Sequence, residues 1–159
     1  LEVKEFDWVE NFINKYKTEL DRENAESSFN FCYALFHYHK KNYVKSLEMA
    51  AKVKSDDLSY KHQLKTLYLK IYFDMNETEA FYTHIDNYKH FISSDNNVTP
   101  QVRSTISNYI NYAKKIYGLK HSVPDKIDIE LIHGEIINNK AMINKPWLLK
   151  KLEELKTSY

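Results

Sequence analysis

Apolar side chains recur every three or four residues along almost the whole chain, and short polar runs interrupt them. This period is that of one face of an α-helix. A first stripe covers residues 6–20, and a second helix, apolar nearly all round, is predicted over 25–39. Further stripes predict helices over 43–53, 58–75, 78–92, 100–117, 125–138 and 146–156. Because no pair of strands is visible, the pattern predicts an all-α protein of about eight helices.

The polar runs between the stripes carry signals for helix ends. Asn42 and Thr78 are predicted N-caps, because their side chains can accept hydrogen bonds from free first-turn amides. Residues 55–57, Ser-Asp-Asp, indicate a turn followed by another cap. Thr99-Pro100 is a cap with proline at the first helical position. Gly118 is placed to end the sixth helix in a left-handed conformation.

The chain of 159 residues contains only 2 glycines and 3 prolines. Phosphate-binding loops and tight hairpin turns need glycine, so this count disfavours Rossmann and P-loop folds and β-sandwiches. Pro124 and Pro146 fit the starts of the last two helices. Gly134 lies inside the seventh stripe, which indicates either a closely packed neighbour or a break in that helix.

The charge is nearly balanced, with 23 basic and 22 acidic residues and a net charge of +1. Such a chain has no global field that would attract nucleic acid, and only Arg22 and Arg103 are arginines. The densest basic stretch consists of seven lysines: Lys40, Lys41, Lys45, Lys52, Lys54, Lys61 and Lys65. We interpret it as a solvated face, with binding of nucleic acid or an anionic surface as the alternative.

The single cysteine, Cys32, cannot form an internal disulfide, and its apolar neighbours predict a small buried thiol. No run approaches the ~18 consecutive apolar residues of a membrane span. The sequence from Leu1 onward does not resemble a signal peptide, so we expect a cytoplasmic protein. Removal of a signal peptide upstream of Leu1 is kept as an alternative.

Seven histidines invite a search for a metal site. His37 and His39, two residues apart, point to different sides of a helix, and the same holds for His84 and His90. The run 133–135, His-Gly-Glu, lacks the histidine pair at i,i+4 of a zinc-binding helix. We therefore expect no metal, no cofactor and no catalytic residues. A hidden enzyme would need a closed polar pocket with strongly perturbed titratable groups.

Self-comparison at an offset of 34 residues indicates a repeat. Leu35 then aligns with Leu69, and Tyr38 aligns with Tyr72. Each unit has the order helix, short turn, helix. Since a single hairpin of this kind cannot bury its apolar face, repeated hairpins stack.

The run 41–47, Lys-Asn-Tyr-Val-Lys-Ser-Leu, resembles the turn and second-helix start of a tetratricopeptide repeat (TPR). Ala34, Ser46 and Ala80 occupy its small positions, which let two helices approach closely. Tyr68 departs from this pattern, because a small residue is expected there. Leu58 departs as well, because it replaces the proline that usually ends a unit.

The runs 67–73 and 147–152 are similar to uncharacterised TPR-like proteins of Bacteroidetes-type bacteria, and the resemblance covers roughly residues 25–156. It implies a right-handed α-solenoid of antiparallel helix hairpins. We expect one domain over residues 1–159, with regular hairpins over 1–120 and capping helices over 121–159. We also expect it to be part of a longer protein, with no catalytic residues to carry over.

In such solenoids the first helix of each pair lines a concave groove, so the resemblance implies a non-enzymatic scaffold for protein–protein contacts. The residues expected to bind the partner are Phe31, Leu35, Tyr38, His39, His62, Lys65, Leu69, Tyr72 and Phe73. Only Lys65 partly fits the known TPR carboxylate clamp, and the groove would suit an apolar peptide or helix instead. The alternative is that these residues pack against a neighbouring helix. The identity of the partner and the oligomeric state stay open.

Overall fold

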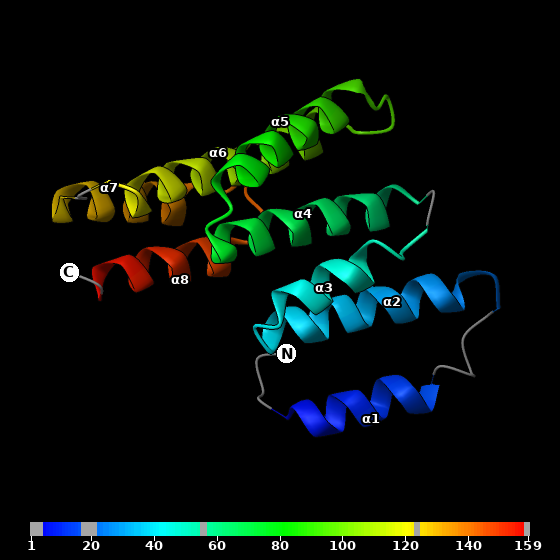
Figure 1. Cartoon of the computed structure of the whole chain (residues 1–159). Coiled ribbons are helices and arrows are strands. Elements are labelled where there is room, and N and C mark those ends of the chain that lie inside the picture. Colours follow the sequence, from blue (N-terminus) through cyan, green and yellow to red (C-terminus); the bar gives the residue numbers. More distant parts are fainter. Residues whose placement is uncertain (1–4, 17–21, 55–56, 123–124, 158–159) are drawn as a thin grey trace. The chain divides into compact units, whose positions relative to one another are not determined.

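The computed structural model describes residues 5–16, 22–54, 57–122 and 125–157 (Figure 1). Every regular element in these ranges is a helix, which confirms the all-α class. The helices are α1 (Phe6–Tyr16), α2 (Arg22–His39), α3 (Tyr43–Ala50), α4 (Leu58–Met75), α5 (Thr78–Ser94), α6 (Pro100–Lys120), α7 (Lys126–Asn138) and α8 (Lys145–Lys156). Within the described ranges, none of them has the length and apolar character that a membrane span requires.

The chain divides into two compact units, Leu1–Phe81 and Tyr82–Tyr159. The boundary falls inside α5, so the first unit contains α1 to α4 and the first turn of α5. The second unit contains the rest of α5 together with α6, α7 and α8. The sequence-based division into hairpins and a C-terminal cap stays a prediction.

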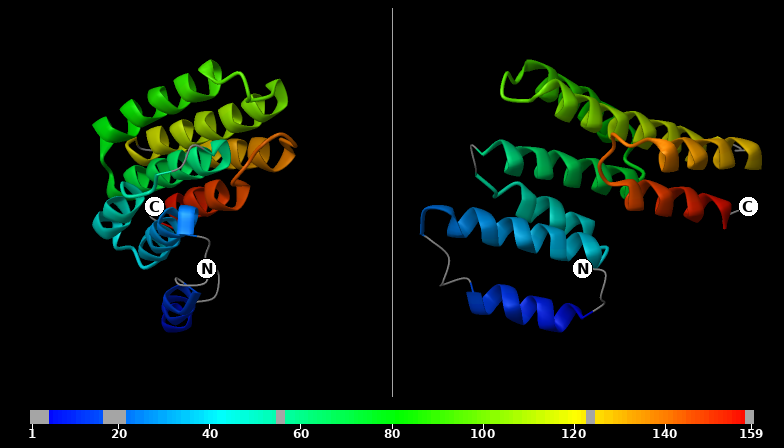
Figure 2. Two further views of the ribbon diagram at one scale, coloured as in Figure 1. Left: turned by 90° about the vertical axis from the view of Figure 1, so that its right-hand side faces the viewer. Right: turned by 180° about the vertical axis from the view of Figure 1, so that it is seen from behind.

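The core of the first unit is built around the antiparallel hairpin of α2 and α3, which lie side by side in the views of Figure 2. Its buried members are Phe31, Ala34, Ala50, Leu67 and Ile71. Ala34 and Ser46 are both fully buried. The Ser46 hydroxyl donates a hydrogen bond to the Ala34 carbonyl over 2.6 Å. The two small positions predicted from the repeat are therefore in direct contact, and they bring the helix backbones close together.

The ends of this hairpin are fixed by polar contacts. Lys41 adopts a left-handed conformation with φ 60° in the turn. Asn42 then accepts from the Lys45 amide, which confirms it as the N-cap of α3. At the open end, the Ser27 hydroxyl donates to the Lys54 carbonyl and accepts from the Lys54 amide at 3.0 Å.

Several predicted helix ends are confirmed, and the start of α5 is shifted. Asp57 caps α4, and Thr99 with Pro100 opens α6. Ser55 and Asp56 lie outside the described residues. Thr78 is the first residue of α5 rather than its cap, because the Phe81 amide already donates to the Glu77 carbonyl.

In the second unit, each helix buries one apolar face. The buried residues of α6, α7 and α8 are Ile106, Tyr109, Ile110, Ala113, Ile116, Tyr117, Ile129, Ile132, Ile136, Leu148, Leu152 and Leu155. The rings of Tyr109 and Trp147 meet edge to face, with centroids 6.1 Å apart, where α8 packs on α6. The Asn108 amide donates to the Ala141 carbonyl over 2.8 Å and so fastens the segment between α7 and α8 to α6.

The loop between α5 and α6 is held by Arg103, one of the two arginines of the chain. Its guanidinium donates to three backbone carbonyls, those of Ser93, Asp95 and Val98, over 3.1–3.4 Å. Ser93 belongs to the last turn of α5, where positive charge is favourable next to the free carbonyls. Arg103 therefore serves the fold rather than a phosphate ligand.

The glycines differ from their predicted roles. Gly118 does not end α6, which continues to Lys120, and neither glycine of the described chain has a positive φ. Gly134 lies inside an unbroken α7, and a Cβ atom at this position would meet no atom within 4 Å. Both explanations offered for Gly134 are therefore wrong. Pro146 lies in the first turn of α8, as expected, whereas Pro124 lies outside the described residues.

Candidate functional site

Of the four residues of α2 that were predicted to bind a partner, three turn toward α4: Phe31, Leu35 and Tyr38. The ring of Phe31 meets the ring of Tyr60 edge to face at 5.7 Å. The Tyr38 hydroxyl donates to Oδ2 of Asp74 over 2.8 Å. Leu35 packs on the same apolar cluster. This side of α2 is therefore a packing surface for α4. On α4 the contact includes Tyr60 and Asp74, which sequence reasoning did not select.

The nine predicted residues differ in their access to water. Phe31, Leu69 and Phe73 are buried, with exposed fractions of 8%, 0% and 2%. His39 is exposed, and the other five, Leu35, Tyr38, His62, Lys65 and Tyr72, are half-buried. A ligand therefore cannot touch the buried three without displacing neighbouring side chains. The other six residues form a partly accessible rim around them.

The rim on α4 carries His62, Lys65 and Tyr72. Their spacing of three and seven residues places them along one side of the helix, next to the buried Leu69. Tyr72 stacks on Tyr68 with ring centroids 6.1 Å apart and an interplanar angle of 22°. Tyr68 was singled out in the sequence only as a departure from the repeat. In the structure it extends the aromatic surface of the rim.

Burial shifts the pKa values of this rim. It lowers the pKa of His62 and the pKa of Lys65, and it raises the pKa values of Tyr68 and Tyr72. Each shift favours the neutral form, because partial removal from water penalises the charged one. The α4 rim is therefore a surface where polar groups are already partly withdrawn from water.

Lys70 is the most strongly perturbed group of the first unit. Burial lowers its pKa to about 8, and the negative charge of Asp74 one turn later opposes this change. Asp74 also accepts the hydrogen bond from Tyr38. Sequence reasoning missed Lys70, because a lysine between apolar positions normally extends its amine into water.

Cys32 is exposed, so the prediction of a buried core thiol is wrong. α2 is apolar on almost every side, and its sequence therefore does not indicate which side faces water. Neighbouring atoms still desolvate the sulfur enough to raise the pKa of the Cys32 thiol. Within the ranges that the structure describes, no three His, Cys, Asp or Glu side chains gather in a way that could hold a metal ion.

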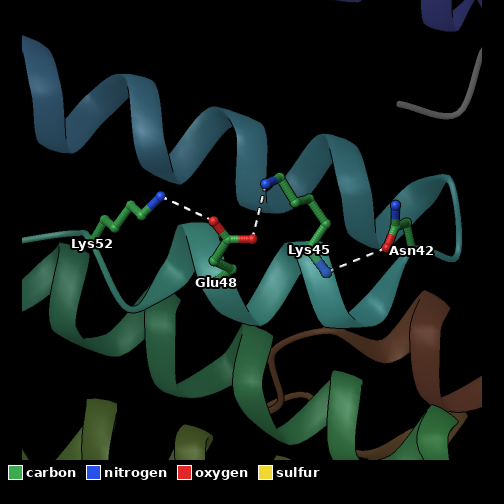
Figure 3. A network of polar contacts seen from close by, with 4 residues as sticks. All are labelled: Asn42, Lys45, Glu48 and Lys52. Carbon is green, nitrogen blue, oxygen red and sulfur yellow. Dashed lines mark hydrogen bonds and ion pairs between the residues drawn. The ribbon is translucent and has the colours of Figure 1, made fainter.

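Three lysines of the basic stretch, Lys40, Lys45 and Lys52, make side-chain contacts within the protein. The amines of Lys45 and Lys52 both donate to the carboxylate of Glu48, over 2.9 and 3.1 Å (Figure 3). These two hydrogen bonds lower the pKa of Glu48. The amine of Lys40 lies over the ring of Phe36, 5.0 Å from its centroid. These lysines are therefore not arranged as a row of free cations.

A shallow hollow with a volume of about 420 Å³ lies at the start of α1. Its lining residues are Glu5, Phe6, Asp7, Trp8 and Lys40. None of the nine predicted binding residues belongs to it. The hollow combines two carboxylates with one amine and two aromatic rings.

No known protein family, curated protein or solved structure matches the chain.

Proposed function

We propose that the chain is a non-enzymatic scaffold for protein–protein contacts, built as a right-handed TPR-like stack of helix hairpins. The close contact between Ala34 and Ser46 supports this proposal, because small residues at these two positions are what the repeat requires. The packing of α2 on α4 through Phe31 and Tyr60 supports it as well, since successive first helices contact each other in such stacks. A cytoplasmic location is part of the proposal.

The contact surface is the α4 rim defined by His62, Lys65 and Tyr72. The observation that carries this assignment is the stacked pair of Tyr68 and Tyr72, which stays half-buried beside Lys65. Tyrosine provides a large contact area at a low entropic cost, and it is enriched at interfaces. The partly exposed rings therefore suit a partner that covers them.

The chemistry of the rim indicates what the partner offers. Water is already partly excluded around Lys65, so a carboxylate placed there interacts more strongly with the amine than it would in bulk water. The tyrosine pair accepts apolar side chains. The partner is thus a peptide or helix that presents apolar residues together with an acidic one.

Site-specific photo-crosslinking in the intact protein tests this assignment. A photo-reactive phenylalanine analogue replaces Tyr72 in one variant and Val44 in the control, because Val44 is 71% exposed on α3. We expect a discrete crosslinked partner from position 72 and none from position 44. Adding Lys65→Glu should remove the crosslink by charge repulsion, whereas Lys150→Glu on α8 should leave it unchanged.

Two results would overturn the assignment. Equal crosslinking from positions 44 and 72 would mean that the contacts are unspecific. A crosslink at position 72 that survives Lys65→Glu would mean that the basic edge takes no part in recognition.

Binding of nucleic acid, the alternative from the sequence, gains no support from the basic stretch. Lys45 and Lys52 pair with Glu48, and Arg103 is engaged with loop carbonyls. Titration with single-stranded and duplex DNA at 50 mM salt separates the two functions. Tight binding with a steep salt dependence would favour the alternative, and absence of binding would eliminate it.

A further inference from the structure

Helix α7 has two apolar faces, and only one of them is covered. Ile129, Ile132 and Ile136 are buried. On the opposite side, Ile127, Leu131 and Ile137 are exposed by 67%, 59% and 52%. A helix that is apolar on both sides normally has a neighbour on each side. Among the described helices of the second unit, α7 has its neighbour on one side only.

Gly134 belongs to the exposed face, seven residues after Ile127 and three after Leu131. A glycine inside a helix costs stability relative to alanine. The space where its Cβ would lie is empty for 4 Å. On the exposed face of α7, the bulky Leu131 is therefore followed within one turn by Gly134. The missing side chain of Gly134 leaves a notch there.

We propose that this face is the contact between two copies of the chain, in which α7 packs antiparallel on α7. With the two-fold axis between positions 131 and 134, Leu131 of each copy lies at Gly134 of the other. The notch then receives the bulky side chain, and the arrangement repeats itself across the axis. Such self-complementarity is what a two-fold interface requires.

The charges along α7 favour the antiparallel orientation. The first half, with its cap, carries the acids Asp125, Asp128 and Glu130 and the base Lys126, a net charge of −2. The second half and the loop after it carry Glu135, Lys140 and Lys145, a net charge of +1. The Lys145 amine also donates to the Ile137 carbonyl. An antiparallel pair brings the acidic end of one copy level with the basic end of the other, whereas a parallel pair would place like charges together. The helix dipoles also oppose each other in the antiparallel pair.

The contact is small, because one helix face contributes it. Interfaces below about 1,200 Å² are typical of transient complexes, so we expect a weak dimer in rapid exchange. This surface lies in the second unit, and the proposal does not depend on the α4 rim of the first.

Sedimentation velocity over a range of concentrations tests the dimer. The wild-type protein should show a concentration-dependent shift from monomer to dimer. Leu131→Lys should raise the dissociation constant at least tenfold, because it places a charge in the notch. Val102→Lys is the matched control, since Val102 is 47% exposed on α6, and this variant should associate like the wild type. A wild-type protein that stays monomeric throughout would overturn the proposal.

Gly134→Ala separates association from stability. A methyl group restricts the notch, so self-association should weaken severalfold. The melting temperature of the dilute monomer should rise by roughly 2–4 °C, because alanine favours the helix. A variant that is more stable and associates as well as the wild type would mean that Gly134 does not receive Leu131.

Disulfide crosslinking tests the orientation. In a Cys32→Ser background, copies with Leu131→Cys and copies with Gly134→Cys are mixed and oxidised. The heterodimer between positions 131 and 134 should form faster than either homodimer. Faster formation of the homodimer between two 131 positions would contradict the proposed antiparallel pairing.

Discussion

In the first unit, α2 and α3 are joined at two small residues, Ala34 and Ser46, whose backbones approach until a side-chain hydroxyl reaches a helix carbonyl. In the second unit, the loops around α6 are joined by long polar side chains, as Arg103 and Asn108 show. One contact depends on the absence of side-chain volume. The other depends on the reach and direction of hydrogen-bond donors.

This difference predicts how each unit responds to substitution. A close helix contact has no free space, so added volume must displace a whole helix. A clamp on a loop lies partly in water, as the Arg103 bond to Ser93 does, and part of its loss is recovered by solvation. The first unit should therefore be sensitive to size, and the second should be sensitive to hydrogen-bond geometry.

The largest effect is expected for Ala34→Leu. Ala34 is fully buried against α3, and the extra volume forces α2 and α3 apart. We expect the free energy of unfolding to fall by about 3 kcal/mol. Urea denaturation measures it, with Ala51→Leu as the control, because Ala51 is exposed at the end of α3 and should change stability by less than about 0.5 kcal/mol. Equal losses in both variants would show that the contact is not tight.

Lys70→Met should stabilise the protein at pH 7 by about 2 kcal/mol, because it removes a buried charge. The folded-state pKa of Lys70 is about 8, below the ordinary 10.5. Between these values the unfolded chain binds more protons, so this lysine makes stability rise with pH, and its penalty is complete below pH 8. The Lys70→Met variant should therefore lack this rise of stability with pH. Denaturation at pH 7 and pH 9.5 measures it, and an unchanged slope would contradict the assignment.

Arg103→Ala should destabilise the second unit by about 2 kcal/mol, since three carbonyls lose a charged donor. Arg103→Lys keeps the charge but not the planar fork, so it should recover less than half of the loss. Thermal unfolding of both variants tests this order. Full recovery by lysine would mean that charge alone holds the loop.

Gly118→Ala should stabilise the second unit by about 0.5–1 kcal/mol. Gly118 lies within α6, has no positive φ, and has free space for a methyl group. Alanine therefore gains helix propensity without a clash. Calorimetry at low protein concentration gives the change in melting temperature. A loss of stability would show that α6 ends at Gly118 in solution.

The smallest effect is expected for Lys41→Gly in the first unit. Lys41 adopts φ 60° in the turn between α2 and α3, where a side chain is unfavourable. Glycine removes that strain but gives the unfolded chain more freedom, so the net gain is about 0.5 kcal/mol. Lys41→Ala is the matched control and should not stabilise. Equal stability of both variants would show that the positive φ at position 41 does not destabilise the turn.

The eight helices could be predicted because their apolar period is regular and their caps are local signals. Asn42, Asp57 and Thr99 each act within three residues of their own position. Gly118 misled the prediction, because a glycine ends a helix only where the backbone turns left-handed, and here α6 continues past it.

The candidate site was harder to predict than the fold. The two small residues selected from the sequence, Ala34 and Ser46, are in direct contact, and a close helix contact constrains residue size. The sequence pattern does not distinguish an exposed residue of a helix face from one that is buried between helices. Phe31 and Leu69, which were predicted to bind a partner, are buried. The contributions of Tyr60 and Lys70 depend on which side of α4 faces α2, and this is a tertiary property.

The hydrogen bond between Ser46 and Ala34 joins residues only 12 positions apart, whereas the bond between Tyr38 and Asp74 spans 36. Closing a short loop costs less entropy than closing a long one. Chains rich in local contacts also fold faster. We therefore expect α2 and α3 to pair early during folding, so that α4 docks on a hairpin that is already formed. The contact between the two small residues would then form before α4 docks, so the closest helix contact of the first unit would also be the one that forms first.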